Sequence, residues 1–170
     1  MGFLHRHEDA GGTRYRMREK LFAIGEDFWI ETENGQPAFK VDGKALRVRD
    51  TFILKDASGG DLFKAQAKKL HIHDTMKIER DGDTVATIKK ALITPLRDRF
   101  SIELADGTEL KAKGNIVDHE YKIERDGDTV AEVSKRWFRV RETYGIDVAP
   151  GQDDALIVAV SACIDEMEER

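Results

Sequence analysis

The sequence contains 170 residues, of which 40% are hydrophobic and 36% charged, a balance typical of a folded domain with a polar surface. The net charge of -5 argues against a general nucleic-acid-binding protein, because such proteins depend on a basic face that releases counterions. Cys163 is the one cysteine, which excludes an intrachain disulfide framework and predicts a reducing, cytoplasmic environment.

At the N-terminus, residues 1–14 are predicted to form a flexible segment, and residues 15–170 a single domain. The N-terminal stretch lacks the apolar core of a secretory signal. The longest apolar run, residues 155–164, has about half the length that a membrane-spanning helix needs. We therefore expect no transmembrane segment, and any association with a membrane would be peripheral.

The central part of the chain contains one ten-residue sequence twice, KIERDGDTVA at residues 77–86 and again at 122–131. Each copy predicts a β-hairpin, because an alternating strand is followed by an Asp-Gly turn and a second strand rich in β-branched residues. Similar turn pairs occur at residues 34–35, 42–43, 59–60 and 106–107. Their spacing predicts a meander of antiparallel strands.

Apolar and polar residues alternate within several of these strands. Phe100, Ile102 and Leu104 fall on one face, and residues 110–114 alternate in the same way with lysines. One apolar and one polar face are typical of an antiparallel sheet that covers a core. About twelve such strands in a chain of this length have to close into a barrel or split into a sandwich. A barrel of that size leaves a hollow that a helix, a ligand or water must fill.

The C-terminal segment predicts the filler, a helix over residues 153–167. Asp153 or Asp154 is a suitable N-cap, and among the ten residues that follow Asp154 only Ser161 has a polar side chain. A helix that is apolar on all sides has to be enclosed, which predicts a mainly β fold: a closed antiparallel barrel around a central hydrophobic helix. The β-branched content leaves one alternative open, in which residues 156–160 form a further buried strand.

Three segments resemble the LURP-one-related family, which belongs with the Tubby C-terminal domain and the phospholipid scramblases. They are LHIHDTMKIERDGDTVATIKK at residues 70–90, ETYGIDV at 142–148 and DDALIVAVSACID at 153–165. The resemblance implies a Tubby-like barrel of about twelve strands around a C-terminal helix. It also implies a non-enzymatic binding or scaffold domain, with anionic phospholipid headgroups as the leading ligand. The palmitoylated cysteine cluster of the scramblases has no counterpart here, which puts scrambling itself in doubt.

Basic clusters are the strongest candidates for a binding surface. The segment KRWFRVR, residues 135–141, combines four cations with aromatic side chains, and residues 14–18 alternate arginine with bulky residues. Cations beside aromatic rings suit an anionic membrane, where each cation contributes about 1 kcal/mol. A solvated outer strand face is the simpler interpretation of the same pattern. The predicted lipid- or anion-binding residues are Lys135, Arg136, Trp137, Arg139, Arg141, Lys68 and Lys69.

Catalytic and metal-binding chemistry is not indicated. His71 and His73, in the segment HIHD at residues 71–74, would share one face of a strand and could bind a metal together with His119, but a polar strand end explains them as well. Cys163 lies in the most apolar stretch, where a thiol behaves as a small hydrophobic group. We therefore expect no enzyme, metal or cofactor. The alternatives to a lipid ligand are a protein partner, or a small molecule carried in a cavity beside the helix.

Overall fold

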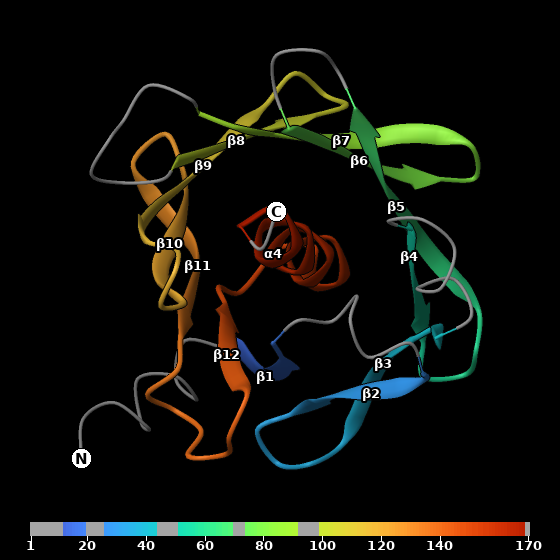
Figure 1. The fold of residues 1–170 in the computed structure, drawn as a ribbon, viewed down its shortest axis with the longest axis vertical. Coiled ribbons are helices and arrows are strands. Elements are labelled where there is room, and N and C mark those ends of the chain that lie inside the picture. Colours follow the sequence, from blue (N-terminus) through green and yellow to red (C-terminus); the bar gives the residue numbers. More distant parts are fainter. Residues whose placement is uncertain (1–11, 20–25, 44–50, 70–73, 92–98, 169–170) are drawn as a thin grey trace.

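The computed structural model describes residues 12–19, 26–43, 51–69, 74–91 and 99–168. Within these ranges, twelve antiparallel β-strands form one closed barrel around an α-helix, which confirms the predicted fold (Figure 1). The elements are β1 (Thr13–Arg18), β2 (Phe28–Thr32), β3 (Pro37–Val41), β4 (Thr51–Asp56), β5 (Asp61–Lys69), β6 (Asp74–Arg80), β7 (Asp83–Lys90), β8 (Arg99–Leu104), β9 (Glu109–Asn115), β10 (Glu120–Arg125), β11 (Asp128–Ser134), β12 (Thr143–Val148) and α4 (Asp154–Glu168).

The strands follow a simple meander. Each strand from β2 to β11 pairs with the next one along the chain, and β1 closes the barrel by pairing with both β12 and β2. Closure removes the exposed sheet edges on which other chains could pair. Recognition by this fold therefore has to use the outer wall or the connections at the two ends.

The two copies of the repeated sequence form the same hairpin, β6–β7 and β10–β11. In each copy the Asp and Gly of the turn both have positive φ, 52° and 84° at Asp81 and Gly82, and 49° and 87° at Asp126 and Gly127. These angles are those of a type I′ turn, whose twist matches that of the flanking strands. Each copy also contains a register shift between its Ile and Glu residues. Identical sequence thus gives identical local structure, as expected.

The turn predicted at residues 42–43 is wrong. β3 ends at Val41 and β4 begins at Thr51, so this connection is longer than a two-residue turn, and residues 44–50 lie outside the described part of the chain. Gly43 serves a different purpose, because a Cβ atom at this position would lie 2.2 Å from the backbone of Glu26. The glycine permits this close approach of two backbones.

The C-terminal segment is a helix, and the alternative strand at residues 156–160 is excluded. Asp153 caps the helix, since its Oδ1 accepts a hydrogen bond of 3.2 Å from the backbone N–H of Leu156. The Tyr15 hydroxyl donates a hydrogen bond to the Asp154 carboxylate. This bond joins the start of α4 to β1. The residues of α4 that are at most 3% exposed are Ile157, Val158, Ala159, Val160, Ser161, Ala162, Cys163, Ile164 and Met167.

Small inward-facing residues make room for the helix. Ala65 on β5 and Ala86 on β7 are buried, and both strands contact α4, as do β6 and β12. Larger side chains such as Phe52 and Phe100 fill the remaining interior. Small inward residues beside larger ones thus let the barrel enclose a helix.

The two ends of the barrel differ. One end carries the short turns of the hairpins, such as those at residues 81–82 and 126–127. The other end, which we call the loop end, carries residues 135–142 between β11 and β12, residues 116–119 between β9 and β10, and the C-terminus of α4. Among the described helical residues, none forms a segment that is long and apolar enough to cross a membrane.

Candidate functional site

The β11–β12 loop (residues 135–142) contains Lys135, Arg136, Trp137, Arg139 and Arg141 of the predicted anion-binding set. The loop lies at the loop end of the barrel and leads into β12, which is orange in Figure 1. The interpretation of this segment as an outer strand face is wrong, because β11 has already ended at Ser134. The residues that carry the charge therefore belong to a surface connection.

The first two cations of the loop are paired with carboxylates of the protein. Lys135 Nζ lies 2.5 Å from Glu19 Oε1, and Arg136 Nε lies 3.5 Å from Glu120 Oε2. Glu120 Oε1 also accepts hydrogen bonds from the Ser134 hydroxyl at 2.9 Å and from the backbone N–H of Lys135 at 3.1 Å. Lys135 and Arg136 thus help to hold the start of the loop on the barrel.

The two aromatic residues of the loop fold back onto the outer wall. The Arg14 guanidinium lies 4.0 Å from the centre of the Trp137 ring, and that of Arg16 lies 5.6 Å from the centre of the Phe138 ring. Both rings cover Gly145 of β12, where a Cβ atom would lie 2.6 Å from Trp137. The alternating arginines of β1 therefore act as a platform for the loop, and Trp137 is an anchor to the protein.

The tip of the loop, Arg139-Val140-Arg141, faces solvent. Val140 is 53% exposed, and both arginines are exposed. Within the described part of the chain, neither guanidinium forms an ion pair. The loop closes where the Glu142 carbonyl accepts a hydrogen bond of 2.9 Å from the backbone N–H of Glu19. The tip thus presents two cations on either side of an exposed apolar side chain.

The other predicted pair, Lys68 and Lys69, is not part of this tip. The two residues end β5 at the same end of the barrel, but β1, β2, β3 and β4 lie between β5 and β12 around the ring. Their side chains lie outside the described residues. The structure does place another exposed apolar residue at the loop end, Val117, which is 62% exposed in the β9–β10 turn.

A buried polar cluster connects the loop to the end of α4. His119 Nε2 lies 2.6 Å from Asp165 Oδ1, and its Nδ1 lies 3.7 Å from Glu19 Oε1, the oxygen that also contacts Lys135. The imidazole stacks on Tyr144 with a ring-centre distance of 4.4 Å. Burial raises the pKa of Tyr144 well above its usual value, so this phenol stays neutral. The cluster joins α4, β12, the β9–β10 turn and the loop.

The interpretation of His119 as a metal ligand finds no support in this geometry. In the described ranges, no group of three or more His, Cys, Asp or Glu side chains could hold a metal ion. His71 and His73 lie outside those ranges, so that part of the prediction is not tested. Nothing in the local sequence around His119 indicates Asp165, its partner on the helix, because the two are 46 residues apart.

Cys163 has no features of a nucleophile. It is fully buried within α4, and burial raises the pKa of its thiol. The thiolate is the reactive form of cysteine, so a raised pKa and the absence of solvent contact both disfavour reaction. Ser161, two residues earlier, is equally buried.

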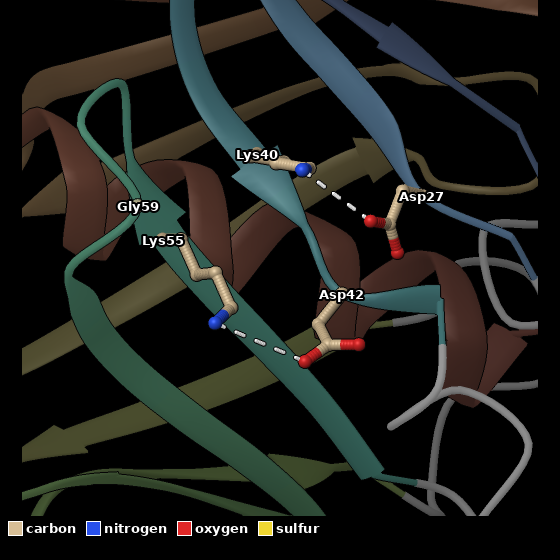
Figure 2. Close-up of a pocket in the computed structure, with 5 residues that line it drawn as sticks. All are labelled: Asp27, Lys40, Asp42, Lys55 and Gly59. Carbon is tan, nitrogen blue, oxygen red and sulfur yellow. Dashed lines mark ion pairs between the residues drawn. The ribbon is translucent and has the colours of Figure 1, made fainter.

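A small pocket lies on the outer wall of β2, β3 and β4, with a volume of about 240 Å³. Figure 2 shows Lys40 pointing toward Asp27 and Lys55 pointing toward Asp42, with Gly59 at the margin. Lys40 Nζ lies 3.3 Å from Asp27 Oδ2, and Lys55 Nζ lies 4.0 Å from Asp42 Oδ2. The pocket is separate from the β11–β12 loop, and nothing in the sequence patterns indicated it.

Comparisons with known proteins agree with this architecture. A family model described as LURP-one-related matches residues 13–165. The structure is similar to the X-ray structure of a protein from Arabidopsis thaliana, with a TM-score of 0.69 and 16% identity over 94% of this chain and 93% of the other. At that identity the similarity concerns the fold. No curated protein matches the sequence. The family match spans nearly the whole barrel and its helix, and the chain belongs to the LURP-one-related family.

Proposed function

We propose that this chain is a non-enzymatic binding domain that recognises anionic phospholipid headgroups through the tip of its β11–β12 loop. The observation that carries the proposal is the exposed sequence Arg139-Val140-Arg141. Its two guanidinium groups form no ion pair within the described residues, whereas Lys135 and Arg136 contact carboxylates of the barrel. Guanidinium groups bind phosphate oxygens in a bidentate geometry, which suits them to lipid headgroups.

The loop is held in a way that keeps this tip exposed. Trp137 and Phe138 pack on Arg14, Arg16 and Gly145, so the loop is anchored immediately before its exposed residues. A cation near an anionic membrane contributes about 1 kcal/mol, and an exposed valine adds a smaller apolar contribution when it enters the interface. Together these terms predict weak, reversible and salt-sensitive binding.

The local charge of the loop end, and not the net charge of the chain, determines how the domain would approach a membrane. The net charge of -5 is repelled by an anionic surface, so attraction depends on the local charge within about one Debye length. Arg139 and Arg141 place positive charge at the loop end, where Val117 is also exposed. We therefore expect the barrel to dock with the loop end toward the lipid and the hairpin turns away from it.

Liposome flotation tests this proposal. We expect the protein to float with vesicles that contain phosphatidylserine or phosphoinositides at low salt, and to stay unbound with phosphatidylcholine. Replacement of both arginines, Arg139→Gln with Arg141→Gln, removes about 2 kcal/mol of attraction and lowers binding roughly thirtyfold. The control variant Lys111→Gln with Lys122→Gln removes the same charge from exposed strand positions and should bind as the wild type.

Equal recovery of the wild type in the unbound fraction with every lipid, at low salt, would contradict the proposal. So would an equal loss of binding in the tip variant and in the control variant, because binding would then reflect net charge and not this loop. In either case the exposed tip would favour the second candidate, a protein-interaction module. Exposed arginines beside an apolar residue are also common at protein interfaces.

A further inference from the structure

The arginines of β1 share the outer face of the barrel but differ in their partners. Arg14, Arg16 and Arg18 alternate with the buried Tyr15 and Met17. The first two arginines each contact an aromatic ring of the β11–β12 loop and a carboxylate of a neighbouring strand. Arg18 is exposed, and within the described part of the chain its guanidinium forms no ion pair. The last arginine of the row is therefore open to a ligand.

Arg18 lies beside the point where the β11–β12 loop closes. It is directly opposite Thr143, the first residue of β12, so the two side chains leave the same face of the sheet about 5 Å apart. The Thr143 hydroxyl donates a hydrogen bond of 3.2 Å to the Arg141 carbonyl, and the backbone N–H of Glu19 donates one of 2.9 Å to the Glu142 carbonyl. These contacts place the base of the Arg18 side chain next to the Arg141 backbone.

The β11–β12 loop also follows β1 toward the C-terminal end of that strand. Trp137 covers Arg14, and the next residue, Phe138, covers Arg16, one position further along the same face of β1. Arg139 comes next in the chain and is exposed. The direction of the loop thus leads it to the end of β1 that carries the unpaired arginine. Three arginines, which we call the arginine site, therefore gather at the loop end: Arg18, Arg139 and Arg141.

Carboxylates near the arginine site offset only part of its charge. Glu19 is already engaged by Lys135 and His119, and its side chain is 15% exposed. Glu142, next to Arg141, is exposed. When the charge of Glu142 is set against the three guanidinium groups, two positive charges remain. Such a site attracts a ligand with two negative charges more strongly than a ligand with one.

We propose that Arg18 is a further binding residue of the loop tip, and that the arginine site selects a phosphomonoester over a phosphodiester. The inference rests on the proposed function and specifies its ligand. At neutral pH a monoester carries about −1.5 to −2 charges, and its three terminal oxygens accept hydrogen bonds from guanidinium groups. A diester has a single charge and one terminal oxygen fewer. The third guanidinium therefore contributes more to a monoester, the group present in phosphatidic acid and in free phosphomonoesters.

Flotation with two kinds of vesicle tests the inference. Phosphatidylcholine vesicles carry either phosphatidic acid or phosphatidylglycerol, adjusted to the same surface potential at constant salt. We expect the wild type to bind phosphatidic acid about fivefold more tightly, and Arg18→Gln to abolish this preference, because one cation contributes about a factor of five near an anionic surface. Arg99→Gln is the matched control and should retain the preference. Arg99 is also exposed at the loop end, forms no ion pair in the described ranges, and is separated from β1 by four strands.

Titration of the ¹⁵N-labelled protein with methyl phosphate and dimethyl phosphate, followed by NMR, separates a free ligand from a lipid. We expect methyl phosphate to shift the Arg18 and Thr143 amides saturably at millimolar concentrations, and dimethyl phosphate to bind about fivefold more weakly. In Arg18→Gln the two probes should bind equally at Thr143.

The two experiments distinguish failure of this inference from failure of the proposed function. Saturation with methyl phosphate but no flotation would assign the arginine site to a free phosphomonoester and contradict the proposed function alone. Flotation without a preference for phosphatidic acid, or with the same preference in Arg18→Gln, would overturn the role of Arg18 and leave lipid binding by the tip standing. If neither the vesicles nor methyl phosphate bind, both are overturned.

Discussion

Deletion of residues 153–170 should abolish the cooperative thermal unfolding of the domain. The deletion removes α4, whose residues from Ile157 to Ile164 are at most 3% exposed, and leaves a barrel without its central packing. Burial of four large aliphatic side chains and of Met167 contributes on the order of 10 kcal/mol before conformational entropy, which is comparable to the net stability of a whole domain. Circular dichroism and calorimetry would show a broad or absent transition.

A point substitution provides a milder form of the same experiment. Val160→Asp places a carboxylate at a position with no solvent exposure and should lower the free energy of unfolding by about 4 kcal/mol or more. Val117→Asp makes the same chemical change where the side chain is 62% exposed, and should change stability by less than about 0.5 kcal/mol. A truncated protein that melts cooperatively, or equal effects of the two substitutions, would contradict a central role for the helix.

His119→Ala should be the most damaging change among the polar residues. It removes the 2.6 Å contact with Asp165, whose carboxylate is buried, and the stacking on Tyr144. Loss of one partner from a buried hydrogen bond to a carboxylate costs about 1–3 kcal/mol, because the other partner keeps its desolvation cost. Urea unfolding of the wild type and of the variant measures this difference.

A double-mutant cycle separates the pair from the other effects of each substitution. The free energy of unfolding should fall less in the double variant, His119→Ala with Asp165→Ala, than the two single decreases predict. The difference should be at least about 1 kcal/mol, because the two groups interact directly. His119→Asn is a useful comparison, since Asn tolerates the positive φ of 53° at this position and retains a hydrogen-bonding side chain. Additive effects of the two alanine substitutions would show that the contact does not contribute to stability.

The barrel could be predicted from the sequence because its determinants are local. Asp-Gly turns and two-residue alternation specify hairpins without reference to the rest of the chain, and both copies of the repeat adopt the expected turn. The helix was identified by its uniformly apolar composition, since only an enclosed position accepts such a surface. The turn at residues 42–43 failed for a tertiary reason, because Gly43 is needed for contact with the distant backbone of Glu26.

The candidate sites depend on contacts that no local pattern reveals. The alternation in residues 135–141 is compatible with a strand, but Trp137 and Phe138 pack on Gly145, and the segment leaves the sheet. The partner of His119 is on the helix, 46 residues away. The outer-wall pocket combines residues of two strands, β3 and β4, with residues of three connections, so neighbouring residues in the sequence give no indication of it.

The reactivity of Cys163 is the most direct test of a helix enclosed by a closed barrel. The chain has no other cysteine, and this side chain has no solvent exposure in the centre of α4. We expect the native protein to react with a thiol-specific reagent such as DTNB at least about a thousandfold more slowly than the urea-unfolded chain, because reaction requires unfolding. A native rate equal to that of the unfolded chain would show that the helix is accessible to solvent, and would contradict the enclosed position on which the whole account depends.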